Sequence, residues 1–339
     1  MPNSKHILVI RLSAMGDVAM TVPVLRALIK QYPELKITIL TRAFFAPFFR
    51  DLQNVQVLTA DVKGKHKGIL GLYKLSKEIK TLGVDAVADL HNVLRSKILK
   101  FFLSGKPFYQ IDKGRNEKKA LISGVVFKPL KTTHQRYADV FKSLGFPIDL
   151  SNPTFPKNAI LNNKCEALLG DLKSKRIGIA PFAAHEGKMY PLSLMKEVIE
   201  TLSKQHKIYL FGGGKQEIEV LNNISEAHEN VQNVAGKLSL NEELDVISNL
   251  DVMLSMDSGN AHIAAMLGVK VVTIWGVTHP YAGFAPFNQP EDFALVADRT
   301  KYPLIPTSIY GNKHPEGYKN AAGSVSPEAI VKKIKELIL

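Results

Sequence analysis

Charged and hydroxyl side chains recur in this chain at one kind of position, directly after a short apolar run and before a helical pattern. The stretch RLSAMGDVAM places Asp17 at such a boundary. A carboxylate there can cap a helix, because it accepts hydrogen bonds from backbone N–H groups and suits the positive end of the helix dipole. The same carboxylate can act as a general base toward a bound hydroxyl group. This stretch alone leaves both interpretations open.

The stretch SMDSGNAHIAAM indicates an anion site. Asp257, Ser258 and Gly259 end a strand pattern and open a helical one, so that backbone N–H groups at the helix start can bind a phosphate. Gly259 allows a ligand to approach the backbone closely. His262 follows on the first helical turn, where it can donate to a phosphate oxygen. A Ser/Asp helix cap with a half-buried histidine is the alternative interpretation.

Two further loops each offer one charged residue. Lys188 stands just before Pro191, which can occupy the first turn of a helix, and a lysine there can neutralise a phosphate group. Glu217 follows the three glycines of LFGGGKQE and could accept hydrogen bonds from ribose hydroxyls. A solvated surface lysine and an acidic first helical turn are the corresponding alternatives.

Several familiar motifs are excluded. GGGK lacks the G-x-x-x-x-G-K-[ST] frame of a P-loop, and S-A-M-G-D is not the G-x-G-x-x-G of a dinucleotide-binding turn. The sequence contains no D-x-D triplet and no Cys/His cluster with metal-ligand spacing. A single cysteine, Cys165, excludes an internal disulfide. We therefore expect neither a bound metal nor a cofactor.

The first half of the chain alternates strand-like and helical patterns. Such alternation predicts parallel βαβ units whose sheet is covered on both faces. Proline, asparagine and lysine then crowd residues 151–164, which we interpret as a linker. The predicted strands are 7–11, 36–40, 55–60, 84–90 and 108–112, and the predicted helices are 18–31, 67–82, 93–103 and 133–144.

The pattern restarts after the linker and ends in a helix with Ser326 as its cap. The sequence therefore predicts an α/β protein with two facing, doubly wound, Rossmann-like domains and a central cleft, where ligands bind outside the carboxyl ends of the strands. We expect domains at 1–155 and 165–325, followed by the helix 326–339. The predicted strands are 175–183, 207–214, 251–259 and 269–276, and the helices are 191–205, 215–226, 240–249 and 260–267, the last but one preceded by the stretch NVQNVAG.

The 339-residue chain has 45% hydrophobic and 22% charged residues, as an ordinary globular protein does, but its net charge of +13 is uneven. Residues 1–150 hold 25 lysines and arginines against 11 acidic residues, a balance of +14, and the remainder balances at −1. A basic half favours an anionic partner, with a lysine-rich solvated surface as the alternative. One candidate patch is Lys63, Lys65, Lys67, Lys74, Lys77 and Lys80, and a second is Arg95, Lys97, Lys100, Arg115, Lys118 and Lys119.

The basic segments lack the interleaved aromatic residues that stack on bases, which argues against a nucleic-acid partner. The first apolar run, in MPNSKHILVI, is only about five residues long, too short for a signal peptide or a membrane span. We therefore expect a cytoplasmic protein.

Taken in order, RLSAMGDVAMTVPVLRAL, GKMYP and DSGNAHIAAMLGVKVVTIWG resemble the lipopolysaccharide heptosyltransferase family, glycosyltransferase family 9. The stretches DLHNVLRSKIL and HQRYADVFKSLGFP match it as well, so the similarity covers nearly the whole chain. The resemblance implies a GT-B fold and a metal-independent, inverting transfer of heptose from ADP-heptose to the inner core of lipopolysaccharide. Another nucleotide sugar or another glycan acceptor is the alternative.

The resemblance also implies roles for individual residues. Asp17 would be the general base, Lys188 and Glu217 would hold the diphosphate and ribose of the donor, and the backbone near Leu238 would border the adenine. The acceptor would be a lipid-linked anionic glycan, reached by peripheral contact with the cytoplasmic face of the inner membrane. The expected phosphate and sugar cradle is Asp257, Ser258, Gly259 and His262, and the candidates for acceptor binding are Arg95, Lys97 and Arg136.

Overall fold

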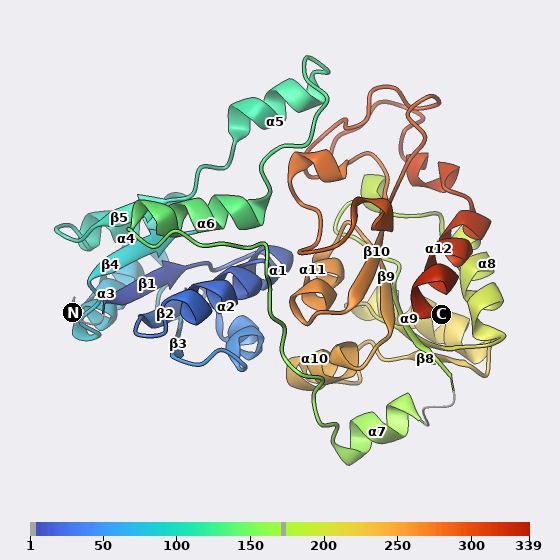
Figure 1. The fold of residues 1–339 in the computed structure, drawn as a ribbon, viewed down its shortest axis with the longest axis horizontal. Helices are drawn as coiled ribbons and strands as arrows, with labels where there is room; N and C mark the ends of the chain where they lie inside the picture. The colour runs from blue at the N-terminus through green and yellow to red at the C-terminus, as the bar shows by residue number, and fades with distance from the viewer. Residues whose placement is uncertain (1–4, 171–173) are drawn as a thin grey trace. The chain divides into compact units, whose positions relative to one another are not determined.

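A computed structural model describes residues 5–170 and 174–339. The chain forms two compact units (Figure 1). The first contains the residues up to Lys113 together with Thr133–Thr154, and the second contains Gly114–Thr132 together with the chain from Phe155 onward.

In the described residues the sheet of the first unit has five parallel strands in the order β3–β2–β1–β4–β5. The central strand β1 is almost entirely apolar and buried, as expected where helices cover both faces of a parallel sheet. The strands are β1 (His6–Ile10), β2 (Lys36–Thr41), β3 (Val55–Thr59), β4 (Ala86–Asp89) and β5 (Phe108–Gln110).

Two helices of this unit, α3 and α4, share one apolar cluster with the sheet. Leu72 and Ile79 of α3 and Leu99 of α4 pack there against Leu8 and Ile10 of β1. Of the remaining helices of this unit, α2 and α6 pack against each other. The helices are α1 (Met15–Ala19), α2 (Thr21–Gln31), α3 (Gly68–Thr81), α4 (Leu94–Phe102) and α6 (Thr133–Ser143), and the 3₁₀ segment η1 is Ala43–Phe49.

The helix predicted over residues 18–31 is wrong in one respect, because the chain forms two helices that meet at Met20. Pro23 explains the break: it has no N–H group to donate to the carbonyl of Ala19, so the helix cannot run through. The Thr21 hydroxyl instead donates to the Val18 carbonyl, at 2.7 Å. As a result Asp17 lies on a separate short helix directly after β1.

The sheet of the second unit is also parallel, in the order β11–β10–β9–β6–β7–β8 over the described residues. The α/β class with two parallel sheets, predicted from the alternating pattern, is confirmed. The strands are β6 (Arg176–Ala180), β7 (Lys207–Leu210), β8 (Val231–Asn233), β9 (Val252–Met256), β10 (Lys270–Trp275) and β11 (Ala294–Val296).

The C-terminal helix α12 begins at the predicted Ser326 cap, whose side chain accepts from the Ala329 N–H, and packs against α8. Its residues Ile330 and Ile334 are fully buried in the core of this unit. The helices are α5 (Arg115–Ile122), α7 (Asn163–Leu169), α8 (Leu192–Ser203), α9 (Lys215–Glu226), α10 (Leu240–Ser248), α11 (Gly259–Met266) and α12 (Pro327–Ile338), and the 3₁₀ turns are Glu186–Lys188, Pro280–Ala282, Glu291–Phe293 and Ala321–Ser324.

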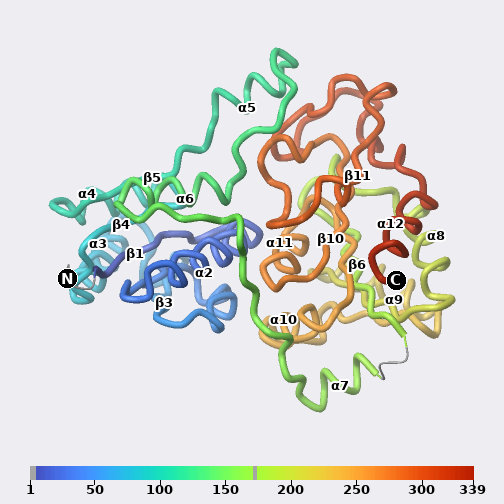
Figure 2. Tube along the Cα trace, in the orientation of Figure 1, coloured from blue at the N-terminus to red at the C-terminus, as the bar shows by residue number. Residues whose placement is uncertain are grey.

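The segment Gly114–Thr132 belongs to the second unit, although its place in the sequence lies inside the range 1–155. Figure 2 shows its trace leading from the end of β5 through α5 to α6. Side-chain contacts explain this: the Lys118 ammonium stands 4.1 Å from the ring centre of Phe284, and the Arg299 guanidinium stands 3.5 Å from that of Phe127. The second predicted basic patch is therefore divided, because Arg95, Lys97 and Lys100 lie on α4 and Arg115, Lys118 and Lys119 lie on α5.

Each sheet has one point where the strand order reverses, between β1 and β4 in the first unit and between β6 and β9 in the second. Ligands of open α/β sheets bind at the carboxyl ends of the strands beside such a point. These two positions are therefore where functional side chains are expected. Among residues 5–170 and 174–339, no helix has both the length and the apolarity needed to cross a membrane.

Candidate active site

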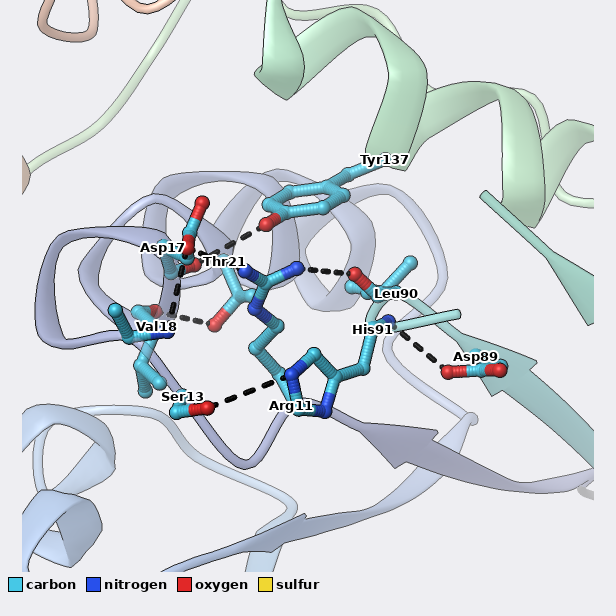
Figure 3. A network of polar contacts seen from close by, with 10 residues as sticks. Arg11, Ser13, Asp17, Val18, Thr21, Asp89, Leu90, His91 and Tyr137 are labelled. Atoms are coloured by element: carbon cyan, nitrogen blue, oxygen red, sulfur yellow. Dashed lines mark hydrogen bonds and ion pairs between the residues drawn. The ribbon is translucent and has the colours of Figure 1, made fainter. Parts of the chain in front are cut away.

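In the first unit, Asp17 follows β1 and forms an ion pair with Arg11 (Figure 3). Arg11 Nη2 lies 2.5 Å from Asp17 Oδ2, and the same oxygen accepts a hydrogen bond from the Ala14 N–H at 3.2 Å. The second oxygen, Oδ1, has no protein partner in the described part of the chain, and the side chain is 29% exposed. One oxygen is thus fixed by the fold while the other remains available to a ligand.

The neighbours of Arg11 hold this pair in place. Its Nη1 donates to the Leu90 carbonyl at the end of β4, at 2.6 Å, and only 7% of the residue is exposed. Tyr137, on α6, donates its hydroxyl to the Asp17 carbonyl at 3.2 Å (Figure 3). Burial raises the pKa of the Tyr137 phenol well above its usual range, so it remains a donor.

His91, after β4, stands beside the same network. Its Nε2 lies 3.5 Å from Ser13 Oγ in the turn that precedes Asp17. Burial, reinforced by the nearby Arg11 charge, lowers the pKa of His91 to about 4 against the opposing effect of Asp89. The imidazole is therefore neutral at neutral pH.

In the second unit, Lys188 after β6 meets Asp257 after β9. Lys188 Nζ lies 2.8 Å from Asp257 Oδ2 and 3.3 Å from the Asp257 carbonyl, and the Thr278 hydroxyl donates to Oδ2 at 2.9 Å. Asp257 is 7% exposed and the Lys188 side chain 15%. An ammonium has three donors. Asp257 accepts two of them, which leaves one for an anion.

Close backbone packing places this lysine. A Cβ on Gly276 would lie 2.3 Å from the Gly187 carbonyl oxygen, so glycine is required where the two turns cross. Gly311 has a positive φ of 76°, and a Cβ there would lie 2.5 Å from Lys188 Cγ. The stem of Lys188 therefore lies across a position that only glycine leaves open.

Ser258 and His262 both accompany Asp257 at the start of α11. Ser258 is the N-cap residue, with its hydroxyl 3.0 Å from that of Ser255 and no side-chain hydrogen bond to the helix. Gly259 is the first helical residue, and His262 is 7% exposed on the first turn. The first N–H groups of a helix have no intrahelical acceptor, so this end of α11 favours an anion.

The two remaining donor candidates lie at other helix starts of the same unit. Glu217 is on the first turn of α9, and its Oε2 accepts the Gly213 N–H at 2.7 Å. Leu238 directly precedes Ser239, the N-cap of α10. The structure places both at the carboxyl edge of the second sheet but without a direct contact to Lys188 or Asp257.

The acceptor candidates are dispersed within the first unit. Arg95 and Lys97 are exposed on α4, whereas Arg136 is 4% exposed on α6, with Nη1 3.4 Å from the Asp112 carbonyl. Arg136 directly precedes Tyr137 in the sequence, and its side chain is fixed by burial and by its hydrogen bond to the Asp112 carbonyl. Lys65, from the first basic patch, is bound by Glu78 at 2.5 Å.

The sequence reasoning assigned no role to Arg11, Tyr137, His91 or Thr278. A basic residue at the end of an apolar strand was the one visible signal, at Arg11. The others are brought in from distant parts of the chain. His279, after β10, has a structural contact: its Nδ1 accepts the Tyr281 N–H at 3.2 Å, so it caps the turn that follows.

Solved structures share this fold. A glycosyl transferase family 9 protein from Veillonella parvula superposes with a TM-score of 0.77 at 20% identity, covering 100% of this chain and 98% of that one. The E. coli heptosyltransferase WaaC with ADP gives 0.67 at 20% identity, covering 98% and 97%. The fold is that of the GT-B glycosyltransferases.

The family follows from sequence comparison. The model of glycosyltransferase family 9 (heptosyltransferase) matches residues 72–304, and the chain belongs to this family and is a transferase. A curated relative, the lipopolysaccharide core heptosyltransferase OpsX of Haemophilus influenzae, is 25% identical over 307 residues, which are 86% of this chain and 84% of that one. The resemblance inferred from the motifs is confirmed.

Proposed function

We propose that this enzyme transfers heptose from ADP-heptose to the inner core of lipopolysaccharide. The observation that carries the proposal is the Lys188–Asp257 pair at the start of α11, within a chain of the heptosyltransferase family. The structure of the E. coli heptosyltransferase WaaC, which shares this fold, was solved with ADP. The lipid anchor of such an acceptor would put the reaction at the cytoplasmic face of the inner membrane.

The donor diphosphate would bind where positive charge is concentrated. Lys188 and the first N–H groups of α11 would neutralise the charge that develops as ADP departs, which is the main electrostatic requirement of this reaction. Ser258 and His262 would donate to phosphate or sugar oxygens. Glu217 would accept from the ribose hydroxyls, and the backbone at Leu238 would border the adenine.

Asp17 would act as the general base. Its Oδ1 would take the proton of the acceptor hydroxyl as that oxygen bonds to the anomeric carbon, while the bond from that carbon to the ADP oxygen breaks. The nucleophile and the leaving group lie on opposite faces of the sugar, so the anomeric configuration inverts. Arg95, Lys97 and Arg136 are proposed to bind phosphate on the acceptor.

The test is a transfer assay with purified enzyme, ADP-heptose and a core acceptor that lacks heptose, read by ADP release and by the mass of the product. We expect one heptosyl group per acceptor and an unchanged rate in excess chelator, because Lys188 and α11 supply the positive charge. UDP-linked and GDP-linked sugars are the controls. Transfer from one of these alone, or loss of transfer on chelation, would contradict the proposal.

Donor binding can be measured separately by thermal shift. A ligand that binds only the folded state raises the free energy of unfolding, by about 2.7 kcal/mol at a ligand concentration of one hundred times its Kd. The melting temperature rises as a result. We expect this effect from ADP and not from UDP.

A further inference from the structure

Two neighbouring helices of the first unit, α3 and α4, expose large apolar side chains. On α3, Ile69 is 64% exposed, Leu70 78% and Tyr73 43%. On α4, Leu94 is 74% exposed and Phe101 76%. Other residues of both helices already fill the core beneath them, so these five are not needed to hold the helices on the sheet.

Ring contacts link the exposed residues of the two helices. Ile69 and Tyr73 are four residues apart on α3, and Leu94 and Phe101 are seven apart on α4, spacings that keep each pair on one side of its helix. Phe102 joins the two helices, because its ring centre lies 5.4 Å from that of Tyr73 and 5.6 Å from that of Phe101. We call Ile69, Leu70, Tyr73, Leu94, Phe101 and Phe102 the α3–α4 face.

Basic side chains surround this face. The sequence of α4, LRSKILKFF, holds three basic residues and no acidic one. The Lys77 ammonium lies 4.7 Å from the ring centre of Tyr73. The single acidic residue of α3, Glu78, is bound by Lys65 and His66. The exposed basic residues are Lys67, Lys74, Lys77, Lys80, Arg95, Lys97 and Lys100.

We propose that the α3–α4 face docks on an anionic lipid bilayer, with its apolar side chains at the boundary of headgroups and acyl chains and its lysines on lipid phosphates. Apolar residues fringed by lysine and arginine are the composition that binds such interfaces. Exposed apolar patches of this kind mark interaction surfaces.

Charge decides between the candidate occupants. A second copy of this chain, meeting the face symmetrically, would bring lysines against lysines. A nucleic acid offers phosphates and base faces, which would leave the exposed aliphatic side chains of Ile69, Leu70 and Leu94 without apolar partners. An anionic membrane satisfies both the apolar and the basic side chains. The proposal rests on the surface of the first unit and not on the identity of the donor or acceptor.

The experiment is cosedimentation of the full-length protein with phosphatidylcholine vesicles, with and without phosphatidylglycerol. We expect binding to rise with the anionic fraction and to fall at high salt, since salt screens the lysine contacts. Lys74→Glu with Lys77→Glu should weaken binding at least about tenfold, because each basic residue near the surface contributes about fivefold. The charge-matched control is Lys142→Glu with Lys332→Glu, which should bind as the wild type does.

The apolar contribution is tested by Leu70→Ser with Phe101→Ser, for which we expect about a tenfold loss per residue. The control is Ile160→Ser, since Ile160 is 96% exposed but lies in the second unit. Circular dichroism checks folding. ADP affinity and turnover on a water-soluble acceptor should be unchanged in Leu70→Ser with Phe101→Ser, so loss of vesicle binding is separable from failure of the proposed enzymatic function.

Three outcomes would overturn the proposal. Equal binding to phosphatidylcholine vesicles with and without phosphatidylglycerol would contradict the role of the lysines. Vesicle binding that survives both double variants would place the contact elsewhere. Self-association by light scattering that these variants abolish, without any vesicle binding, would make a second copy of the chain the occupant.

Discussion

At the scale of residues, the contacts of Asp17 show the capping interaction and are compatible with the proposed role as general base. Its Oδ2 accepts the Ala14 N–H, as a helix-capping carboxylate does, and also holds Arg11. Because both contacts are on Oδ2, capping does not compete with proton transfer at Oδ1. The two roles are compatible in one side chain.

Lys188 carries the first residue-scale prediction. Lys188→Met removes the ammonium at the proposed diphosphate site, and loss of such a charge-assisted contact costs about 1.5–3 kcal/mol. ADP affinity should therefore fall about ten- to hundred-fold, measured by calorimetry below the melting temperature. The melting temperature should fall too, because Asp257 loses its ion-pair partner.

The matched control is Lys333→Met, which removes a lysine that lies 2.9 Å from Asp292. ADP should bind this variant as it binds the wild type. Wild-type ADP affinity in Lys188→Met would make Lys188 a structural partner of Asp257 alone.

His91 carries a prediction about pH. Its pKa is about 4 in the folded protein against an ordinary value of 6.5, so below pH 6.5 the unfolded chain binds a proton that the folded chain does not. Stability therefore falls as the pH falls from 6.5 toward 4, by about 2 kcal/mol at pH 5 from this residue. His91→Gln should remove that part of the decline.

The measurement is urea unfolding of wild type and His91→Gln at pH 7.5 and pH 5. The difference in unfolding free energy between the two should move in favour of the variant at the lower pH. His228→Gln, in the loop between α9 and β8, should leave the decline intact. Parallel pH profiles of wild type and His91→Gln would show that His91 is protonated in the folded state.

At the scale of elements, the N-cap of helix α10 lies next to the proposed adenine site, because Ser239 directly follows Leu238. Ser239 accepts the Glu242 N–H while Glu242 accepts the Ser239 N–H, at 3.3 and 2.8 Å. Ser239→Ala should cost about 1 kcal/mol of stability. It should also weaken ADP binding, because Leu238 directly precedes the cap.

Ser326→Ala is the control for this cap. It removes the equivalent hydrogen bond from α12 and should cost a similar amount of stability without changing ADP affinity. Equal ADP affinity in both variants would contradict the proposed contact between the Leu238 backbone and the adenine.

The elements themselves were largely predictable from the sequence. Short apolar runs such as the ILVI of β1 indicate strands buried on both faces, and Ser326 followed by Pro327 marks a helix start. The division of 18–31 into two helices was missed because apolar periodicity continues across Met20. The three-residue strand β11 was also missed, because its hydrogen bonds are made to the distant β10.

At the scale of the whole molecule, the candidate site was predictable only in part. Polar residues in the loop or first helical turn after a strand, such as Asp257 and Asp17, can be found from local pattern. The contacts between distant residues cannot. Lys188 was a candidate from its own loop, but its pairing with Asp257, 69 residues away, was not predicted, and Tyr137 is 120 residues from Asp17. The order of the strands in each sheet decides which of these residues meet. That order cannot be predicted from the pattern of a single sequence.

The central claim is that Asp17 is the base of a heptosyl transfer, and one variant tests it most directly. Asp17→Asn keeps the shape, and asparagine caps a helix about as well as aspartate does. Its oxygen can still accept from Ala14 and Arg11, so the melting temperature should fall by only a few degrees at about 1 kcal/mol.

The decisive measurement is kcat for transfer from ADP-heptose, alongside ADP affinity, in Asp17→Asn. A general base contributes about 10²–10⁴-fold, so kcat should fall by that factor while ADP affinity stays at the wild-type value. A wild-type kcat in this variant would contradict the account and would leave Asp17 as a helix cap and partner of Arg11.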